Sequence, residues 1–273
     1  PCCIKLVVAN GSVHDPLAAL IPLCVSHSFC RSMRSLYLLY LDRDHLGDPT
    51  FVKSLAQQAG QSPSGEPPSV LVHGSGEKVE RTLEAEGYFL ERVNGTLEVE
   101  TDAQRRLVER AVREVNQDLV GTLTDEVVST VGIQGVDRGL LALDEAGTLQ
   151  AGATGWVEAL VKQRVLPVVS ALARTPGDAP VREVSTADVV ETLATAFADT
   201  FDPTAVFLAT TGRPGIPDND DIRDDIAIDA VTEAHVASPE VVRRVFNTGI
   251  PVLLTSVRGF FAEDDPTGTR VVS

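Results

Sequence analysis

Residues 69–77 read Ser-Val-Leu-Val-His-Gly-Ser-Gly-Glu. An aliphatic run ends in a glycine-rich turn, and a helix-forming segment, Lys78–Glu86, follows directly. A strand, a glycine turn and a helix in this order let backbone N–H groups and a helix N-terminus approach an anion. Gly74 and Gly76 lack a Cβ, so the chain can turn sharply there. A tight turn in any α/β protein has the same pattern, so the motif alone predicts the fold class without selecting a ligand.

Apolar runs alternate with amphipathic segments along most of the chain, which is typical of an α/β protein with a largely parallel sheet flanked by helices. The predicted strands are Cys3–Val8, Ser69–Val72, Ser129–Ile133, Val165–Ser170, Ala205–Ala209 and Pro251–Thr255. The predicted helices are one that begins with a capping box at Thr101 and Gln104, then Thr186–Phe197 and Glu240–Phe246. Hairpins are predicted at Phe89–Glu100 and Leu140–Gln150. A loop at Arg174–Pro180 separates two predicted lobes, residues 1–175 and 176–273.

The composition excludes several classes of protein. Of 273 residues, 43% are apolar, and the formal net charge is −16. The apolar fraction is that of a globular protein, and the acidity argues against a nucleic-acid partner. Proline, histidine and arginine interrupt the apolar segment Leu17–Leu41, so we expect no membrane-spanning helix. The 4 cysteines lack metal-binding spacing, so we expect reduced thiols, no metal site in the protein and a cytoplasmic location.

Short motifs in a fixed order resemble the amino-acid kinase family, and within it the N-acetylglutamate kinases. The matching segments are His73–Gly76, Val93–Gly95, Val115–Leu119, Val131–Ile133, Leu166–Ser170, Thr186–Asp188 and Gly268–Arg270. Each match is short, so the common order carries the comparison. The resemblance covers residues 69–209 and the C-terminal tail.

This resemblance implies a three-layer α/β sandwich of the amino-acid kinase type, also known from carbamate kinase, with two lobes. The N-terminal lobe would bind an N-acylated amino acid and form a homodimer or a larger homo-oligomer, and the C-terminal lobe would bind ATP with Mg²⁺. The implied reaction is phosphorylation of a side-chain carboxylate, a step of arginine biosynthesis. Such a site works by positioning the reactants and neutralising charge on the migrating phosphoryl group.

The resemblance also assigns roles to individual residues. The catalytic residues would be Lys5, on the first predicted strand, and Asp188, at a helix start. Substrate-binding residues would be Gly74, Ser75, Gly76, Asn116 and Thr186, and nucleotide-binding residues would be Gly11, Ser12, Thr210, Gly212 and Gly215. Alternative interpretations stay open: Lys5 as an ordinary strand-end lysine, Asp188 as an acid favoured by the helix dipole, and Asn116 as a solvated helix position.

The chain departs from the family pattern at several places. Thr96–Glu98 stands where the family has a substrate-binding arginine, and no lysine follows Lys162. Arg243 or Arg244 could supply the missing charge with a different geometry. The long spacing between Lys5 and the glycine turn predicts an insertion within Ser26–Asp48. These departures favour a second hypothesis, a catalytically impaired protein that binds a ligand for regulation or assembly.

Overall fold

The computed structural model describes residues 34–63, 66–93, 96–177, 179–209, 212–218, 221–262 and 265–273, without the side chain of Val93. The predicted strand Cys3–Val8 and the predicted site residues Lys5, Gly11, Ser12 and Thr210 lie outside these ranges. Met33–Ser273 forms one compact unit. The division into lobes at residues 175 and 176 stays a prediction.

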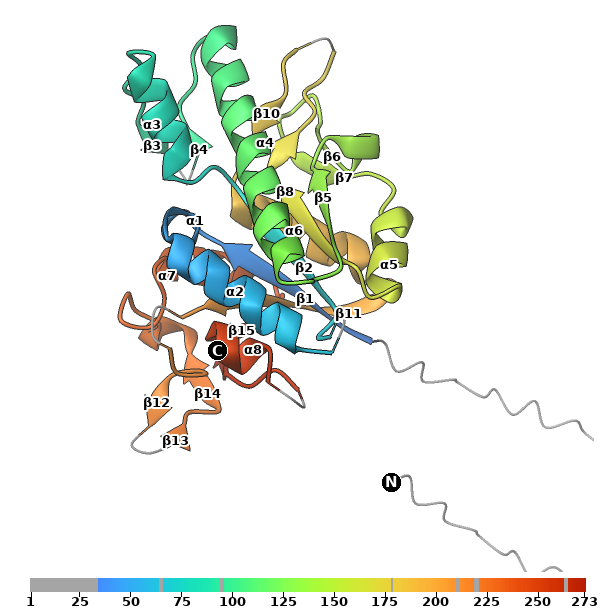
Figure 1. Ribbon diagram of the computed structural model, residues 1–273, viewed down its shortest axis with the longest axis vertical. Coiled ribbons are helices and arrows are strands. Elements are labelled where there is room, and N and C mark those ends of the chain that lie inside the picture. Colours follow the sequence, from blue (N-terminus) through green and yellow to red (C-terminus); the bar gives the residue numbers. More distant parts are fainter. Residues whose placement is uncertain are drawn as a thin grey trace, which may run out of the picture. The chain divides into compact units, whose positions relative to one another are not determined.

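An eight-stranded, mostly parallel sheet forms the centre of this unit (Figure 1). Its strands are β1 (Arg34–Leu41), β2 (Ser69–His73), β5 (Thr130–Gln134), β8 (Leu166–Ser170), β11 (Phe201–Leu208), β14 (Asp225–Ala227), β15 (Val252–Thr255) and β16 (Thr269–Val272). The strand order is β14-β16-β15-β11-β1-β2-β8-β5, and only the β15–β16 pair in this sheet is antiparallel. Every predicted strand within the described residues is confirmed to within a few residues.

An insertion is predicted within Ser26–Asp48, but residues 34–48 of this segment contain the central strand β1 and are part of the fold. Residues 26–33 lie outside the described ranges. β1 pairs in parallel with β11 on one side and β2 on the other. Leu36 and Leu38 are buried on one face of the sheet, and Leu39 and Leu41 on the other. A strand covered on both faces has a continuous apolar run rather than an alternating pattern. That explains why this segment shows no strand period in the sequence.

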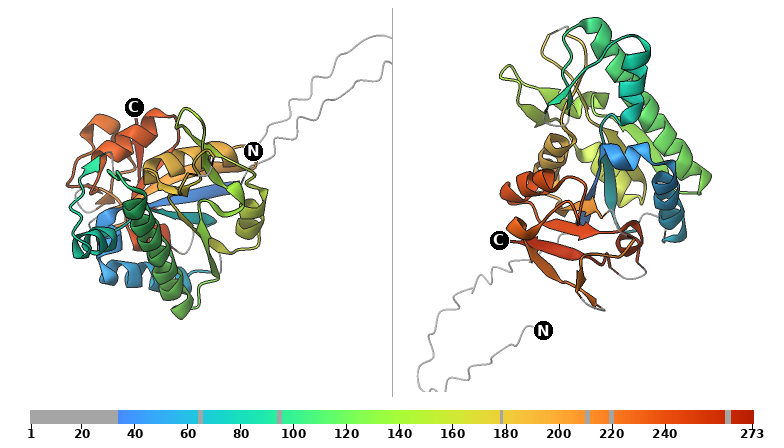
Figure 2. Two further views of the ribbon diagram at one scale, coloured as in Figure 1. Left: turned by 90° about the horizontal axis from the view of Figure 1, so that it is seen from above. Right: turned by 90° about the vertical axis from the view of Figure 1, so that its left-hand side faces the viewer.

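Helices cover both faces of the sheet, which confirms the predicted three-layer α/β fold (Figures 1 and 2). On one face, α2 (Pro49–Gln61), α4 (Asp102–Asp125) and α8 (Val257–Phe260) pack against alternate residues of the strands. On the other face lie α5 (Gly155–Lys162), α6 (Thr186–Phe197) and α7 (Pro239–Asn247). α3 (Glu77–Ala85) packs on the N-terminal half of α4 through a smaller apolar cluster.

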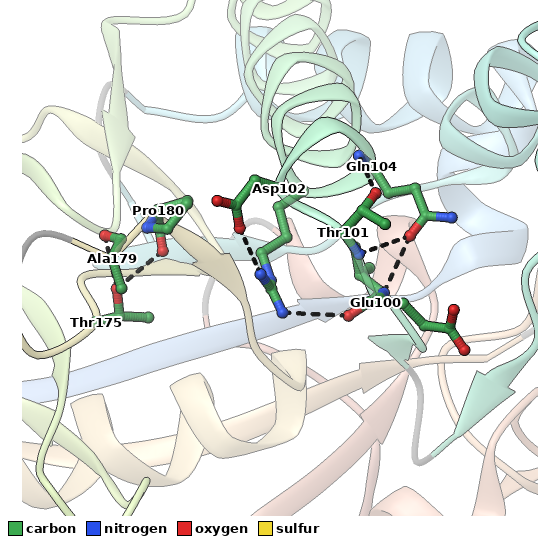
Figure 3. Close-up of polar contacts among 9 residues, drawn as sticks. Glu100, Thr101, Asp102, Gln104, Thr175, Ala179 and Pro180 are labelled. Atoms are coloured by element: carbon green, nitrogen blue, oxygen red, sulfur yellow. Dashed lines mark hydrogen bonds and ion pairs between the residues drawn. The ribbon is translucent and has the colours of Figure 1, made fainter.

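The predicted capping box at the start of α4 is confirmed (Figure 3). The Thr101 hydroxyl accepts a hydrogen bond from the Gln104 N–H at 3.2 Å, and Gln104 Oε1 accepts one from the Thr101 N–H at 2.9 Å. Figure 3 also shows the loop before β10, where the Thr175 hydroxyl donates to the carbonyls of Ala179 and Pro180. These local bonds fix the helix start and the loop without distant partners.

Short elements complete the described part of the chain. Four hairpins pair β3 (Arg92–Val93) with β4 (Thr96–Leu97), β6 (Leu141–Leu143) with β7 (Leu149–Ala151), β9 (Leu172–Ala173) with β10 (Arg182–Glu183), and β12 (Pro217–Asp218) with β13 (Asp221–Ile222). The first two are the predicted hairpins. The remaining short helices are α1 (Arg43–Gly47), η1 (Asp137–Gly139) and η2 (Ile228–Ala230). Within the described ranges, no helix is long and apolar enough to cross a membrane.

Candidate functional site

The central parallel strands end together at one edge of the sheet. Their register places Leu41 beside His73, and His73 beside Ser170, so β1, β2 and β8 end in line. Ligands of open parallel sheets bind outside the carboxyl ends of the strands. The glycine turn Gly74–Gly76 leaves β2 at this edge and leads into α3. The edge is therefore the candidate functional site.

Two cavities open at this edge. The first, of about 480 Å³, is here called the turn cavity, and its lining includes Tyr40, Asp42, Arg43, Asp44, Gly74, Ser75, Arg92, Thr186, Glu240 and Arg244. The second, of about 1020 Å³, is here called the hairpin cavity, and its lining includes Glu98, Arg105, Arg182, Glu183, Asp188, Glu191 and Arg244. Ser185 and Arg244 line both cavities, which makes them neighbours.

The glycine turn packs tightly against its surroundings. A Cβ on Gly74 would lie 2.7 Å from the Thr186 hydroxyl, and one on Gly76 would lie 2.9 Å from Cβ of Leu46. Both distances are too short for a larger residue without a shift of the neighbour. Ser75 has no positive φ, so the serine between the glycines is not strained. The turn therefore brings Gly74, Ser75 and Thr186 together, as predicted from the sequence order.

A buried carboxylate already occupies the N–H of this turn. Ser75 N donates to Glu183 Oε1 at 2.6 Å, and Glu183 Oε2 has no hydrogen-bond partner. Burial raises the pKa of Glu183, although the bonds from Ser75 and the charge of Arg92 act to lower it. Arg92 Nη2 donates to the Ser75 carbonyl at 3.3 Å and to its hydroxyl at 3.1 Å. The backbone donor predicted to meet a phosphate therefore binds a side chain of this protein.

A buried network of polar side chains lies next to the glycine turn. Asn116 Nδ2 lies 2.9 Å from His73 Nε2 and 2.9 Å from the Val168 carbonyl, and Gln134 Nε2 donates to Asn116 Oδ1 at 3.2 Å. His73 Nδ1 lies 2.9 Å from the Gly74 carbonyl. Burial lowers the pKa of His73 to about 4, so the ring is neutral at pH 7. An amide and a carbonyl as partners then require the tautomer with the proton on Nδ1.

The predicted role of Asn116 in substrate binding stays a prediction, and the structure buries its side chain in this network. Asn116 is 2% exposed and lines neither cavity. Its amide contacts His73, Val168 and Gln134 instead. Asn116 is therefore linked to the glycine turn through His73.

The N-terminus of α6 faces the turn cavity. Its N-cap residue Ser185 makes no side-chain capping bond, and Thr186 and Ala187 line the cavity. Asp188, in the first turn, forms an ion pair with Arg244 of α7, and Arg244 Nε also lies 3.2 Å from Glu191 Oε1. Arg243 points elsewhere, because its Nη2 donates to the Val231 carbonyl at 2.5 Å. Of the two arginines considered from the sequence, Arg244 is the one at the site.

Charged residues follow β1 at the same edge. Asp42 caps α1 and accepts a bond from the His45 N–H at 2.8 Å. Burial acts to raise the pKa of Asp42, but the contacts with His45 outweigh it and lower the pKa. Arg43 and Arg92 both bind Glu80, at 2.6 Å and 2.8 Å. The sequence pattern does not predict Asp42 and Arg43 at the site, because their segment has the features of an insertion.

The predicted nucleotide-binding glycines that the structure describes lie away from both cavities. Gly215 has a φ of +128°, and a Cβ there would lie 2.6 Å from Ile222 and 3.0 Å from the Thr269 hydroxyl. Gly212 has open space around it. Neither residue lines the turn cavity or the hairpin cavity. Their role in nucleotide binding stays a prediction.

The described side chains form no group of three or more His, Cys, Asp or Glu residues that could hold a metal ion. Magnesium in kinases keeps several waters and binds through one or two carboxylates and the phosphates of the substrate. Asp42 and Asp44 line the turn cavity and have the oxygen ligands that Mg²⁺ prefers. Asp42 and Asp44 are therefore the described residues of the turn cavity that could bind a magnesium ion carried by a nucleotide.

Comparison with known proteins identifies the class. No protein-family model matches the chain. The structure resembles a protein of Streptococcus mutans UA159, smu.665, with a TM-score of 0.60 and 18% identity over 88% of this chain and 99% of the other. It also resembles an isopentenyl phosphate kinase, with a TM-score of 0.56 and 12% identity over 87% of this chain and 100% of the other. The aspartate kinase of Synechocystis has a TM-score of 0.55 and 15% identity over 89% of this chain and 40% of the other. The fold is therefore the amino-acid kinase fold.

Sequence comparison adds relatives from within this class. Acetylglutamate kinases from two strains of Chloroflexus aurantiacus are 27% identical to this chain over 186 residues, which is 61% of this chain and 68% of each relative. The predicted resemblance to the amino-acid kinase family, and within it to acetylglutamate kinase, is confirmed. The chain is kinase-like in sequence and in fold.

Proposed function

We propose that the chain transfers the γ-phosphoryl group of ATP to the side-chain carboxylate of an N-acylated amino acid, with N-acetylglutamate as the first candidate. One observation carries the proposal. The glycine turn after β2 and the N-terminus of α6 border the same cavity at the carboxyl edge of a parallel sheet. A helix N-terminus offers backbone N–H groups toward an anion, and the turn would offer the Ser75 N–H when a ligand replaces Glu183 there. The similarity to acetylglutamate kinases supports the acceptor, and such an activity would serve arginine biosynthesis.

In the proposed reaction, a carboxylate oxygen of the acceptor attacks the γ-phosphorus. The bond from that phosphorus to the bridging oxygen breaks, ADP leaves, and an acyl phosphate forms. The N–H groups at the start of α6 and in the glycine turn would stabilise the negative charge on the phosphoryl oxygens. Mg²⁺ would neutralise further charge on the ATP phosphates.

Individual residues have specific roles in this proposal. Gly74, Ser75 and Thr186 would contact the reacting groups from the turn cavity. Gly76, which packs against Leu46, would shape the turn that binds them. Asp188 would orient Arg244 through their ion pair, which replaces a second lysine by a guanidinium. The cation from Lys5 and the nucleotide contacts of Gly11, Ser12, Thr210, Gly212 and Gly215 complete the proposed set.

A second candidate function is ligand binding without turnover, for regulation or assembly. The charge balance at the turn cavity favours it. Arg43 and Arg92 pair with Glu80, and Arg244 pairs with Asp188 and Glu191. Guanidinium groups already neutralised by carboxylates stabilise a migrating phosphoryl group less than free cations do.

Release of ADP, measured by a coupled assay with ATP, Mg²⁺ and N-acetylglutamate, distinguishes the two functions. Phosphoryl transfer predicts ADP release that requires the acylated amino acid and that falls by at least about tenfold in Arg244→Gln. Arg258→Gln is the matched control, because Arg258 is exposed on α8, against the other face of the sheet. Stabilisation of the protein by the amino acid in a thermal-shift assay, with no ADP released, would favour binding without turnover.

A further inference from the structure

The carboxylate of Glu183 lies where the glycine turn would receive an anionic ligand. Glu183 is on β10, 108 residues along the chain from Ser75, and its Oε1 accepts the Ser75 N–H at 2.6 Å. The same oxygen would lie 3.1 Å from a Cβ on Gly74. One carboxylate oxygen thus accepts the Ser75 N–H and also fills the space beside Gly74 that a side chain would take.

This contact is incomplete as a structural anchor. Glu183 is 8% exposed, yet its second oxygen, Oε2, has no hydrogen-bond partner. A buried carboxylate normally has every lone pair satisfied or is paired with a cation. Arg92 is near enough to lower the pKa of Glu183 and Glu80 to raise it, while Arg92 itself binds Glu80. A carboxyl group that serves only stability would be better paired or replaced by an apolar side chain.

We propose that Glu183 competes with an anionic ligand of the glycine turn. Its carboxylate accepts the anion-binding Ser75 N–H until the ligand takes its place. This inference rests on the proposed function, because it assumes that the turn receives a phosphate or carboxylate group. Two negative groups compete for one N–H, so the affinity for an anionic ligand is lower than the turn alone would give. Arg92 donates to the carbonyl and the hydroxyl of Ser75. A ligand that displaces Glu183 from Ser75 would therefore also change the surroundings of Arg92.

The test is the affinity of ATP for the whole chain, measured by isothermal titration calorimetry for wild type, Glu183→Gln and Glu98→Gln. Glutamine keeps the size of the side chain and removes its charge. Glu98 lines the same hairpin cavity and is exposed, so Glu98→Gln controls for loss of one negative charge nearby. We expect Glu183→Gln to bind ATP at least about fivefold more tightly and Glu98→Gln to change the affinity by less than about twofold.

A second measurement follows the contact itself. A hydrogen bond to a carboxylate moves an amide proton downfield, so the Ser75 amide should shift in Glu183→Gln, and in wild type when ATP is added. If ATP binds wild type and Glu183→Gln equally, or binds the variant less tightly, the inference is wrong and the proposed function stands. If ATP binds neither protein, the proposed function fails and the inference with it. A Ser75 amide that responds to neither change would also overturn the inference.

Discussion

Replacing His73 by glutamine removes a buried titrating group from beneath the glycine turn. His73 is fully buried, and its pKa lies at about 4 instead of the ordinary 6.5. Glutamine Oε1 can accept the bond from Asn116 that His73 Nε2 accepts now. It cannot take up a proton in this pH range, so the variant isolates the titration of the imidazole.

The direction in which stability changes with pH follows from the pKa of His73 in the folded and in the unfolded chain. Because the folded-state value is the lower one, the unfolded chain binds the proton first as the pH falls. The stability that depends on neutral His73 is therefore complete above pH 6.5 and is lost as the pH falls toward about 4. Over the two pH units down to about 4.5, at about 1.4 kcal/mol for each unit, the wild type loses about 3 kcal/mol through this group.

The assay is urea unfolding at about pH 7.5 and about pH 4.5. Glu183 acts in the opposite direction, since its raised pKa favours the folded state as the pH falls, and Asp42, with its lowered pKa, contributes at the acid end. Both groups are present in wild type and variant, so their effects cancel in the difference. The variant should lose about 3 kcal/mol less than wild type over this range. The partly exposed His235, changed to glutamine, is the control. Equal losses in wild type and His73→Gln would refute the account of a neutral, buried imidazole.

Further predictions concern the same network and the helix that supports it. Gly132→Ala should destabilise the fold by about 1–3 kcal/mol in urea unfolding, because the new Cβ would lie 2.4 Å from Asn116 Oδ1. Gly121→Ala, in α4 with nothing within 4 Å, should instead stabilise it by about 0.5–1 kcal/mol, and a loss there would contradict the packing described. Thr101→Ala should cost about 1 kcal/mol by removing the cap of α4. Thr124→Ala, which removes a hydroxyl bonded back to the preceding turn, is its control and should change the stability by less than about 0.5 kcal/mol.

Local patterns allowed much of the fold to be predicted from the sequence. The strand, glycine turn and helix at residues 69–77 and the capping box at Thr101 depend on neighbouring residues, and both are present. β1 was missed because a strand buried on both faces has no alternation, and arginine and tyrosine interrupt its apolar run. With β1 misplaced, Asp42 and Arg43 could not be placed at the site.

For the site, too, the sequence predicts the place of some residues and not of others. Thr186 lies beside Gly74 of the glycine turn, while Asp188 lines the neighbouring hairpin cavity and pairs with Arg244. The order of the motifs predicts that Thr186 and the turn belong to one site. Glu183 gave no signal, because its contact with Ser75 spans 108 residues and depends on how the β9–β10 hairpin packs. The contact of Asn116 with His73 also could not be predicted, because the sequence of a helix does not show which polar residue is buried.

The most direct test of phosphoryl transfer is detection of the acyl phosphate itself. Hydroxylamine converts an acyl phosphate into a hydroxamate, which can be quantified beside the ADP formed from ATP, Mg²⁺ and N-acetylglutamate. Our account predicts hydroxamate and ADP in equal amounts, with both dependent on the acylated amino acid. ADP without hydroxamate, or binding of both ligands without either product, would contradict it.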